Sequence, residues 1–312
     1  MADSLSVDNQ KKEPGAAGTN GGKPSQSGLL AAFVAFLFWG LLPVFWKSLD
    51  SIDSFELLCH RVTWSFVFLL PFMLFSGHIA GLATFLQSFR NFLGLLFSGF
   101  LLAANWYLYI WAVNSGMILE ASLGYFINPL VNILFGVVIF HEKAGRLAWL
   151  GIGAAALGVA FQVILLGHLP WVPLGLAFSF GVYGLMRKLL QVQALPGLFV
   201  ETLVVMPFAL GYLLWHSHSA GAAFFPGDSI TNVLLIGSGV LTTVPLLCFA
   251  YGARRIRMTS LGILQYVSPT CSFLLGLFVY KENITPEGLF TFVCIWIGLT
   301  LYTWETTRKH NW

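Results

Sequence analysis

Two stretches of this chain repeat one pattern: residues 123–142 are LGYFINPLVNILFGVVIFHE, and residues 263–282 are ILQYVSPTCSFLLGLFVYKE. Both are apolar with an internal proline, and both end in a glutamate at the same distance beyond that proline. A length of about 20 mostly apolar residues is typical of a membrane-spanning helix. The repetition predicts a membrane protein built from two related units.

The chain as a whole is strongly apolar, with 57% hydrophobic and 9% charged residues. A water-soluble domain carries roughly 25% charged residues. So few charges do not cover a water-facing surface, and we predict an all-α integral membrane protein whose partners are the lipid bilayer and a small-molecule substrate. The net charge of +3 is small and does not indicate a nucleic-acid partner.

The sequence indicates no cofactor and no metal site. Residues 21–25, GGKPS, lack the spacing of a phosphate-binding loop, so nothing indicates transport driven by nucleotide hydrolysis. The four cysteines lie singly in apolar segments, and His216 and His218 have no third ligand near them in the sequence.

Ten segments are apolar over a length that suits a membrane span, although the sixth and tenth are short. They cover residues 29–46, 57–75, 92–113, 122–140, 147–166, 172–186, 198–215, 230–251, 260–280 and 288–302. The polar ends of the chain predict a disordered cytoplasmic tail at residues 1–27 and a cytoplasmic C-terminal tail at residues 306–312. Between them the segments predict two five-helix repeats, at residues 28–168 and 169–305.

The 16 Lys and Arg residues indicate which loops face the cytoplasm. With the N-terminus inside, only Lys47 and Lys281 fall on the outer side, and Arg61 lies within a span. All others fall in inner segments: Lys11, Lys12, Lys23, Arg90, Lys143, Arg146, Arg187, Lys188, Arg254, Arg255, Arg257, Arg308 and Lys309. This bias follows the positive-inside rule for an even number of spans with both ends in the cytoplasm. The first five spans then start inside and the next five outside, which predicts two inverted repeats.

Each proline stretch carries a polar face that is a candidate substrate pathway. A proline leaves the carbonyl four residues earlier without its helical donor, and inside a membrane that group must face protein or a wet cavity. Positions i, i+3 and i+7 share one side of a helix. The faces that contain the freed carbonyls are polar in both stretches: Tyr125, Asn128 and Asn132 in the first, and Gln265, Ser268 and Ser272 in the second. The alternative is a simple kink with ordinary hydrogen bonds between helices.

Further pathway candidates adjoin these faces or occupy matching places in the two halves. Trp39 and Tyr183 each precede a Gly-Leu pair at equivalent positions, and aromatic side chains suit organic substrates. The remaining candidates are the two prolines, the tyrosine beside Gln265 and an isolated asparagine in the third span: Pro129, Pro269, Tyr266 and Asn105.

Four ionisable residues in or beside the spans are candidates for coupling or gating: Arg61, His60, Glu120 and Glu201. Glu120, in an outer loop, is the expected partner of Arg61, and snorkelling of Arg61 to the interface is the alternative. Glu201 lies roughly 20 Å from Arg61 along the membrane normal, too far for a salt bridge. We expect Glu201 to hold a proton or cation, to gate the inner side, or to bond a neighbouring helix. His60 titrates near neutral pH unless it is only structural.

Small residues mark the fifth span: Gly151, Ala154, Ala155 and Gly158. They allow close contact with another helix, either within the subunit or in a dimer, and the sequence leaves both options and the oligomeric state open.

Several of these residues lie in motifs that resemble a known family. The paired proline helices in two five-span halves are similar to the EamA group of the drug/metabolite transporter superfamily. The closer resemblance, over everything after about Leu29, is to its RarD permeases. It rests on His60-Arg61-Val62, Asn105-Trp106, Trp111-Ala112-Val113-Asn114, EASLGYFINPL at 120–130, Glu201-Thr202-Leu203 and TTVPLLC at 242–248.

The resemblance implies a bacterial inner-membrane protein that moves a small organic molecule, and it does not give the substrate. Together with the repeats, it favours a secondary transporter, a permease or exporter working by alternating access, with proton coupling or facilitated diffusion both open. A membrane sensor or scaffold is the first alternative, and it would need a soluble module. A membrane-embedded enzyme is less favoured, because the spans lack a reactive cluster.

Overall fold

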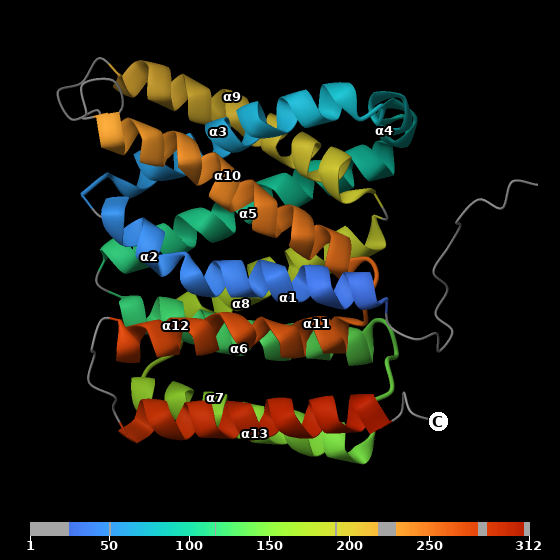
Figure 1. The fold of residues 1–312 in the computed structure, drawn as a ribbon, viewed down its shortest axis with the longest axis vertical. Helices are drawn as coiled ribbons and strands as arrows, with labels where there is room; N and C mark the ends of the chain where they lie inside the picture. The colour runs from blue at the N-terminus through green and yellow to red at the C-terminus, as the bar shows by residue number, and fades with distance from the viewer. Residues whose placement is uncertain are drawn as a thin grey trace, which may run out of the picture.

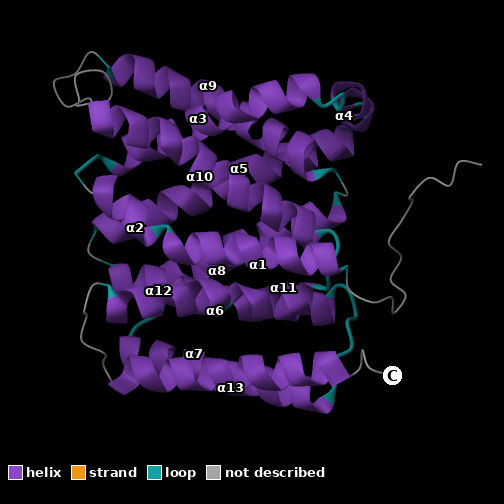
Figure 2. Ribbon diagram, in the orientation of Figure 1, coloured by secondary structure: helices purple, strands orange, loops and turns teal. Residues whose placement is uncertain are grey.

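The protein was examined as a computed structural model, which describes residues 25–49, 51–115, 117–190, 192–217, 229–279 and 286–308. Within these ranges every regular element is helical (Figure 2). Most of the predicted N-terminal tail lies outside them, as do His218, Lys281 and Glu282, so the predictions for those residues stay predictions.

A helix or a pair of helices covers each of the ten predicted segments. The first half contains α1 (Gln26–Leu41), α2 (Pro43–Trp46), η1 (Lys47–Leu49), α3 (Ser54–Phe75), α4 (Ile79–Leu86), α5 (Phe89–Asn114), α6 (Ile118–Val138) and α7 (Arg146–Leu166). The second contains α8 (Trp171–Leu189), α9 (Ala194–His216), α10 (Ser229–Ala253), α11 (Met258–Gln265), α12 (Val267–Phe278) and α13 (Pro286–Arg308).

Eight helices in the described part of the chain are long and apolar enough to cross a membrane. The predicted sixth and ninth spans are not among them. The sixth corresponds to α8, which has 19 residues and a more polar C-terminal end, and the ninth is divided into α11 and α12. Large apolar side chains also point outward, such as Phe75 at 89% exposed and Leu157 at 68%. Such a surface suits hydrocarbon as the solvent, and the chain is a multi-pass membrane protein.

The two proline stretches fold differently. Helix α6 continues through Pro129, whereas the second stretch breaks at Tyr266, three residues before Pro269. The amide of Tyr266 there bonds the carbonyls of Ile263 and Leu264, which is one tight turn between the two helices. The short helix α4, which the sequence analysis did not predict, lies across the bundle and is seen end-on in Figure 1.

The helix contacts relate the two halves of the chain. Helix α1 packs on α10 as α8 packs on α5, and α1 packs on α11–α12 as α8 packs on α6. Helices α3 and α9, α6 and α11, and α7 and α13 contact each other directly, with α7 and α13 forming one edge of the bundle (Figure 1). Each of these contacts has an equivalent when helices are exchanged between the halves. The exchanged helices are α1 with α8, α3 with α9, α5 with α10, α6 with α11–α12, and α7 with α13.

The first turn of α1 and the last turn of α13 lie at the same end of the bundle, here called the termini end (Figure 1). Helix α2 lies at the opposite end, where α3 also begins. A residue near the start of α3 is therefore far from the termini end, whereas one near the start of α9 is close to it.

Two glycines allow α7 and α13 to cross closely. A Cβ at Gly151 would lie 2.6 Å from the carbonyl oxygen of Gly298, and one at Gly298 would lie 2.5 Å from the carbonyl oxygen of Gly151. Ala155, one turn along the same face, is 1% exposed. The small residues of the fifth span thus pack within the subunit.

We expect Gly151→Ala to destabilise the protein by about 1–3 kcal/mol, because the added methyl group overlaps the backbone of α13. The measurement is the thermal melting temperature of the detergent-purified protein. Gly153→Ala on the same helix is the control, since its Cβ meets no atom within 4 Å. Equal melting temperatures for the two variants would show that the crossing tolerates separation.

Candidate functional site

Three polar side chains on the proline helices bond to one another between the two halves of the chain. Asn132 donates from Nδ2 to Asn128 Oδ1 at 3.1 Å and also to Gln265 Oε1. Gln265 Nε2 donates to the same Asn128 oxygen, and Asn128 Nδ2 donates to the Ala177 carbonyl of α8 at 2.8 Å. We call Asn128, Asn132 and Gln265 the amide cluster; all three are buried.

The amide cluster forms because α6 and α11 approach closely beside it. A Cβ at Gly262 would lie 2.5 Å from the carbonyl oxygen of Pro129, so only glycine leaves room for this contact. Asn132 and Gln265 then meet across the interface. The oxygen Oδ1 of Asn132 accepts no hydrogen bond from the residues that the structure describes. Asn128 and Asn132 of the first predicted face therefore meet Gln265 of the second.

The parts of the two polar faces that lie away from the termini end have different surroundings. Tyr125, one turn from Asn128 on α6, is 48% exposed, and its ring lies 5.5 Å from that of Tyr109. On α12, Ser272 donates to the Gly40 carbonyl of α1 at 3.2 Å, while Ser268 is half-buried. The face on α6 is therefore open at Tyr125 and closed at the amide cluster.

The remaining pathway candidates are packed in the protein. Tyr266 and the two prolines are buried, and the hydroxyl of Tyr266 donates to the Phe126 carbonyl at 3.4 Å. Asn105 donates to the Leu176 carbonyl at 3.0 Å and to Ser179 at 2.8 Å, so its amide joins α5 to α8.

Trp39 and Tyr183 meet through a shared ring, as their equivalent positions suggest. The ring of Phe249 lies 5.6 Å from that of Trp39 and 5.9 Å from that of Tyr183, centroid to centroid. Tyr183 is fully buried, whereas Trp39 is half-buried. These aromatic side chains join α1, α8 and α10 between the two halves.

A second polar site, here called the carboxylate site, surrounds Glu201. The Glu201 carboxylate accepts hydrogen bonds from Ser98 of α5 at 2.5 Å and from Tyr183 of α8 at 3.3 Å. It also forms an ion pair with Arg187 at 3.3 Å, and both side chains of that pair are completely buried. Arg187 in turn donates to the carbonyls of Gln193 and Ala194. This site joins α5, α8 and α9 near the termini end.

Arg187 corrects one part of the charge assignment. The positive-inside argument counted it as a loop residue, but it is the seventeenth residue of α8 and 0% exposed. The close approach of Gly197, where any Cβ would overlap the guanidinium, makes room for it. A basic residue directly after an apolar segment is expected to lie in a loop. The signal in the sequence that could have indicated burial of Arg187 is Glu201, a carboxylate within the next predicted span.

The glutamate that ends the first proline stretch also ties the two halves together. Glu142 accepts hydrogen bonds from the amides of Met258 and Thr259 at 2.8 and 2.9 Å, and from the Thr259 hydroxyl at 2.8 Å. Its carboxylate therefore caps the first turn of α11. Lys188 Nζ lies 3.8 Å from it. The sequence marked Glu142 as a repeated residue without showing this contact.

Arg61 lies in a third site, near the end of the bundle opposite the termini. Its guanidinium carbon is 4.6 Å from the centroid of the Trp46 ring and 4.7 Å from that of Trp106. Its Nε donates to the Thr242 hydroxyl at 3.2 Å. We call Arg61, Trp46, Trp106 and Thr242 the arginine site. It joins α2, α3, α5 and α10.

The expected pairing of Arg61 with Glu120 is absent among the described contacts. Glu120 Oε1, in the first turn of α6, instead lies 3.8 Å from Nε2 of His168, in the connection between α7 and α8. This pair is near because α6 packs against α8. As expected, Arg61 and Glu201 form no salt bridge. His60 lies 3.8 Å from Glu56, one turn earlier on the same helix.

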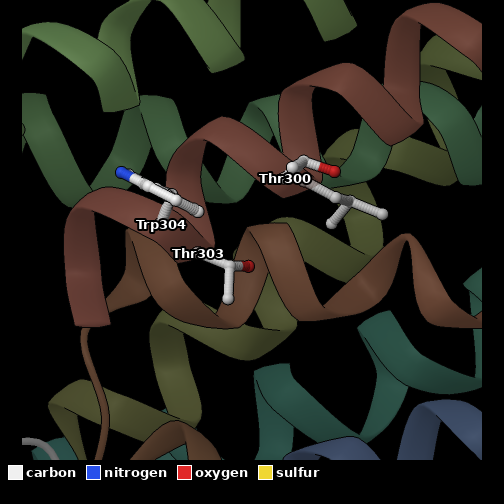
Figure 3. A pocket seen from close by; sticks show the side chains of 4 residues that line it. Thr300, Thr303 and Trp304 are labelled. Carbon is white, nitrogen blue, oxygen red and sulfur yellow. The ribbon is translucent and has the colours of Figure 1, made fainter. Parts of the chain in front are cut away.

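A shallow hollow on α13 is lined by Leu299, Thr300, Thr303 and Trp304 (Figure 3). It contains no residue of the amide cluster, the carboxylate site or the arginine site. The described residues contain no group of three His, Cys, Asp or Glu suited to a metal ion.

Apolar helices that bury three polar sites between two halves of the chain define a multi-pass membrane protein. The chain belongs to the EamA-like transporter family, which matches residues 26–164 and again residues 170–304. Within that family it is of the RarD type. The fold is shared with a protein of known crystal structure, at a TM-score of 0.66 and 20% identity, over 90% of this chain and 99% of the other.

Relatives with names support the same assignment. The uncharacterized transporter YojE of Bacillus subtilis is 42% identical, over 91% of this chain and 96% of its own. Protein RarD of Escherichia coli is 40% identical, over 91% and 96%. The chloramphenicol-sensitive protein RarD of Pseudomonas aeruginosa is 30% identical, over 91% and 96%.

We expect Glu201→Gln to lower the melting temperature strongly, because it leaves the buried Arg187 without a counter-charge, a loss of about 3–5 kcal/mol. The double variant Arg187→Met/Glu201→Gln removes that charge and is expected to recover most of the loss. The exposed Glu287→Gln serves as the control. A double variant less stable than Glu201→Gln would contradict this account.

Proposed function

We propose that the protein is a secondary transporter that moves a small organic solute across the bacterial inner membrane by alternating access. The observation that carries the proposal is the amide cluster, where polar side chains of both halves meet inside an apolar bundle. Buried polar groups within membrane helices commonly mark a substrate path. Neutral amides both donate and accept, so they can exchange bonds to one another for bonds to a solute.

The proposed architecture is ten spans in two inverted five-helix repeats, 28–168 and 169–305, with both termini in the cytoplasm. The interchangeable helix contacts of the two halves and the two separate family matches support the repeats. The clustering of Lys and Arg supports the orientation, with the termini end inside. A C-terminal green fluorescent protein fusion is then expected to fluoresce, and a C-terminal alkaline phosphatase fusion to be inactive. The reverse pattern would overturn the orientation.

In this scheme the conformation described above is open to the outer side and closed to the cytoplasm. Tyr125 is exposed on the outer side of the amide cluster, while Asn128 and Asn132 are buried. Toward the cytoplasm, the Glu201–Arg187 pair and the cap by Glu142 hold the helices together. Opening inward requires both contacts to separate. Protonation of Glu201 would weaken its pair with Arg187, which is the route for proton coupling that we propose.

The pathway is tested by replacing one polar residue from each face. Asn128→Leu and Ser268→Leu are each expected to reduce flux about tenfold, because the solute loses hydrogen-bond partners. The measurement uses purified protein in liposomes, a broad metabolite mixture, and mass spectrometry of the contents with and without a proton gradient.

Thr300→Leu, in the surface hollow on α13, is the control for this experiment, and melting temperatures check the folding of each variant. Normal flux in both pathway variants would place the substrate elsewhere. If no solute enters faster than into protein-free liposomes across several broad mixtures, the transport function itself is refuted.

A further inference from the structure

We propose that the solute is a small organic carboxylate and that Arg61 binds its anionic group. This inference rests on the transport function proposed above and adds the chemical class of the substrate. It comes from the arginine site, where the described residues offer a buried cation no carboxylate partner.

Arg61 is 91% buried within the apolar bundle, at 9% exposure. Within the described residues, the Arg61 side chain makes one hydrogen bond, from Nε to the Thr242 hydroxyl. Its terminal nitrogens Nη1 and Nη2 donate no hydrogen bond to these residues. No described carboxylate lies within ion-pair distance of the guanidinium. A guanidinium carries five donors, and leaving most of them unused at such a depth is costly.

The other buried arginine of the bundle shows the contrast. Arg187 pairs with Glu201 and also donates to two backbone carbonyls. Its charge is neutralised within the protein, which fits a structural or gating contact. Among the described residues, the guanidinium of Arg61 has the Thr242 hydroxyl and the faces of Trp46 and Trp106 as its contacts. The two rings attract a cation but accept no strong hydrogen bond.

The groups around Arg61 are suited to an anion. The hydroxyls of Tyr109 and Tyr125 are near enough to interact electrostatically with the guanidinium, and both can donate hydrogen bonds. Tyr125 is also the exposed residue of the α6 polar face, on the outer side of the amide cluster. A solute that reaches Tyr125 therefore meets the field of Arg61 before it meets the amides.

The geometry also indicates which kind of anion fits. The two terminal nitrogens of a guanidinium match the two oxygens of one carboxylate in a bidentate pair. The rings of Trp46 and Trp106 offer apolar surface beside that pair. The polar body of the solute would then extend toward Asn128 and its neighbours, which bond uncharged polar groups.

The test uses full-length protein in liposomes and one mixture of water-soluble hydroxy-carboxylates and dicarboxylates, their primary amides, their phosphate-ester analogues, and quaternary ammonium compounds. Mass spectrometry measures uptake into liposomes with wild-type protein, Arg61→Gln or Arg61→Lys. Arg255→Gln is the matched control, because Arg255 stacks on Tyr251 at the exposed end of α10.

Wild-type protein is expected to take up carboxylates at least about tenfold faster than the matching amides. Arg61→Gln is expected to remove that preference. Arg61→Lys is expected to retain it at about tenfold lower flux, since the charge stays and the bidentate geometry is lost. Arg255→Gln is expected to behave as wild type.

Three other outcomes overturn the inference. Preferred uptake of amides or ammonium compounds by the wild type refutes the anionic class, while leaving transport intact. Preferred uptake of phosphate esters refutes the carboxylate assignment. An unchanged carboxylate preference in Arg61→Gln refutes the role of Arg61. The first and second outcomes are read from the wild type alone, so they hold even if a variant does not fold. Absence of any uptake refutes the transport function instead.

Discussion

The absence of water in the bilayer core is the constraint on which this structure depends. Polar groups there find partners within the protein or face a wet path, because each unsatisfied group is costly. The bundle meets this constraint by gathering its polar side chains into three sites between the halves. The amide cluster satisfies most of its own hydrogen bonds, and the carboxylate site pairs both of its charges. The arginine site differs from both, because its charge has no carboxylate partner among the described residues.

Close backbone approach and polar pairing depend on each other here. The contact between Gly262 and the Pro129 carbonyl brings α11 near enough to α6 for short amide side chains to meet. Likewise, Gly197 leaves space for the guanidinium of Arg187 beside Glu201. Glycine removes the side chain that would separate the helices, and the polar contact then stabilises the approach. The alternating access proposed above would separate these interfaces at a few defined contacts.

The three sites also differ in how they would respond to a moving solute. The amide cluster is neutral, so it exchanges partners without burying a charge. The Glu201–Arg187 pair joins α8 and α9 near the termini end through opposite charges, and it is fully buried. Arg61, beside the exposed Tyr125, is the charge that a solute approaching from the outer side would meet first. In the proposed mechanism, attraction, selection and closure are thereby divided among separate residues.

The sequence by itself determined the membrane class, the positions of the helices and the equivalence of the two proline stretches, because apolar length, repetition and proline are local properties of the chain. It also singled out Asn128, Asn132, Gln265, Arg61 and Glu201. Only the tertiary structure decided which of them meet. Long-range packing joined Asn132 to Gln265, gave Glu201 the partner Arg187, placed Glu120 beside His168, and directed Gly151 at Gly298 within the subunit. The second proline helix also breaks at Tyr266 while α6 is continuous, a difference that the proline shared by both stretches does not account for.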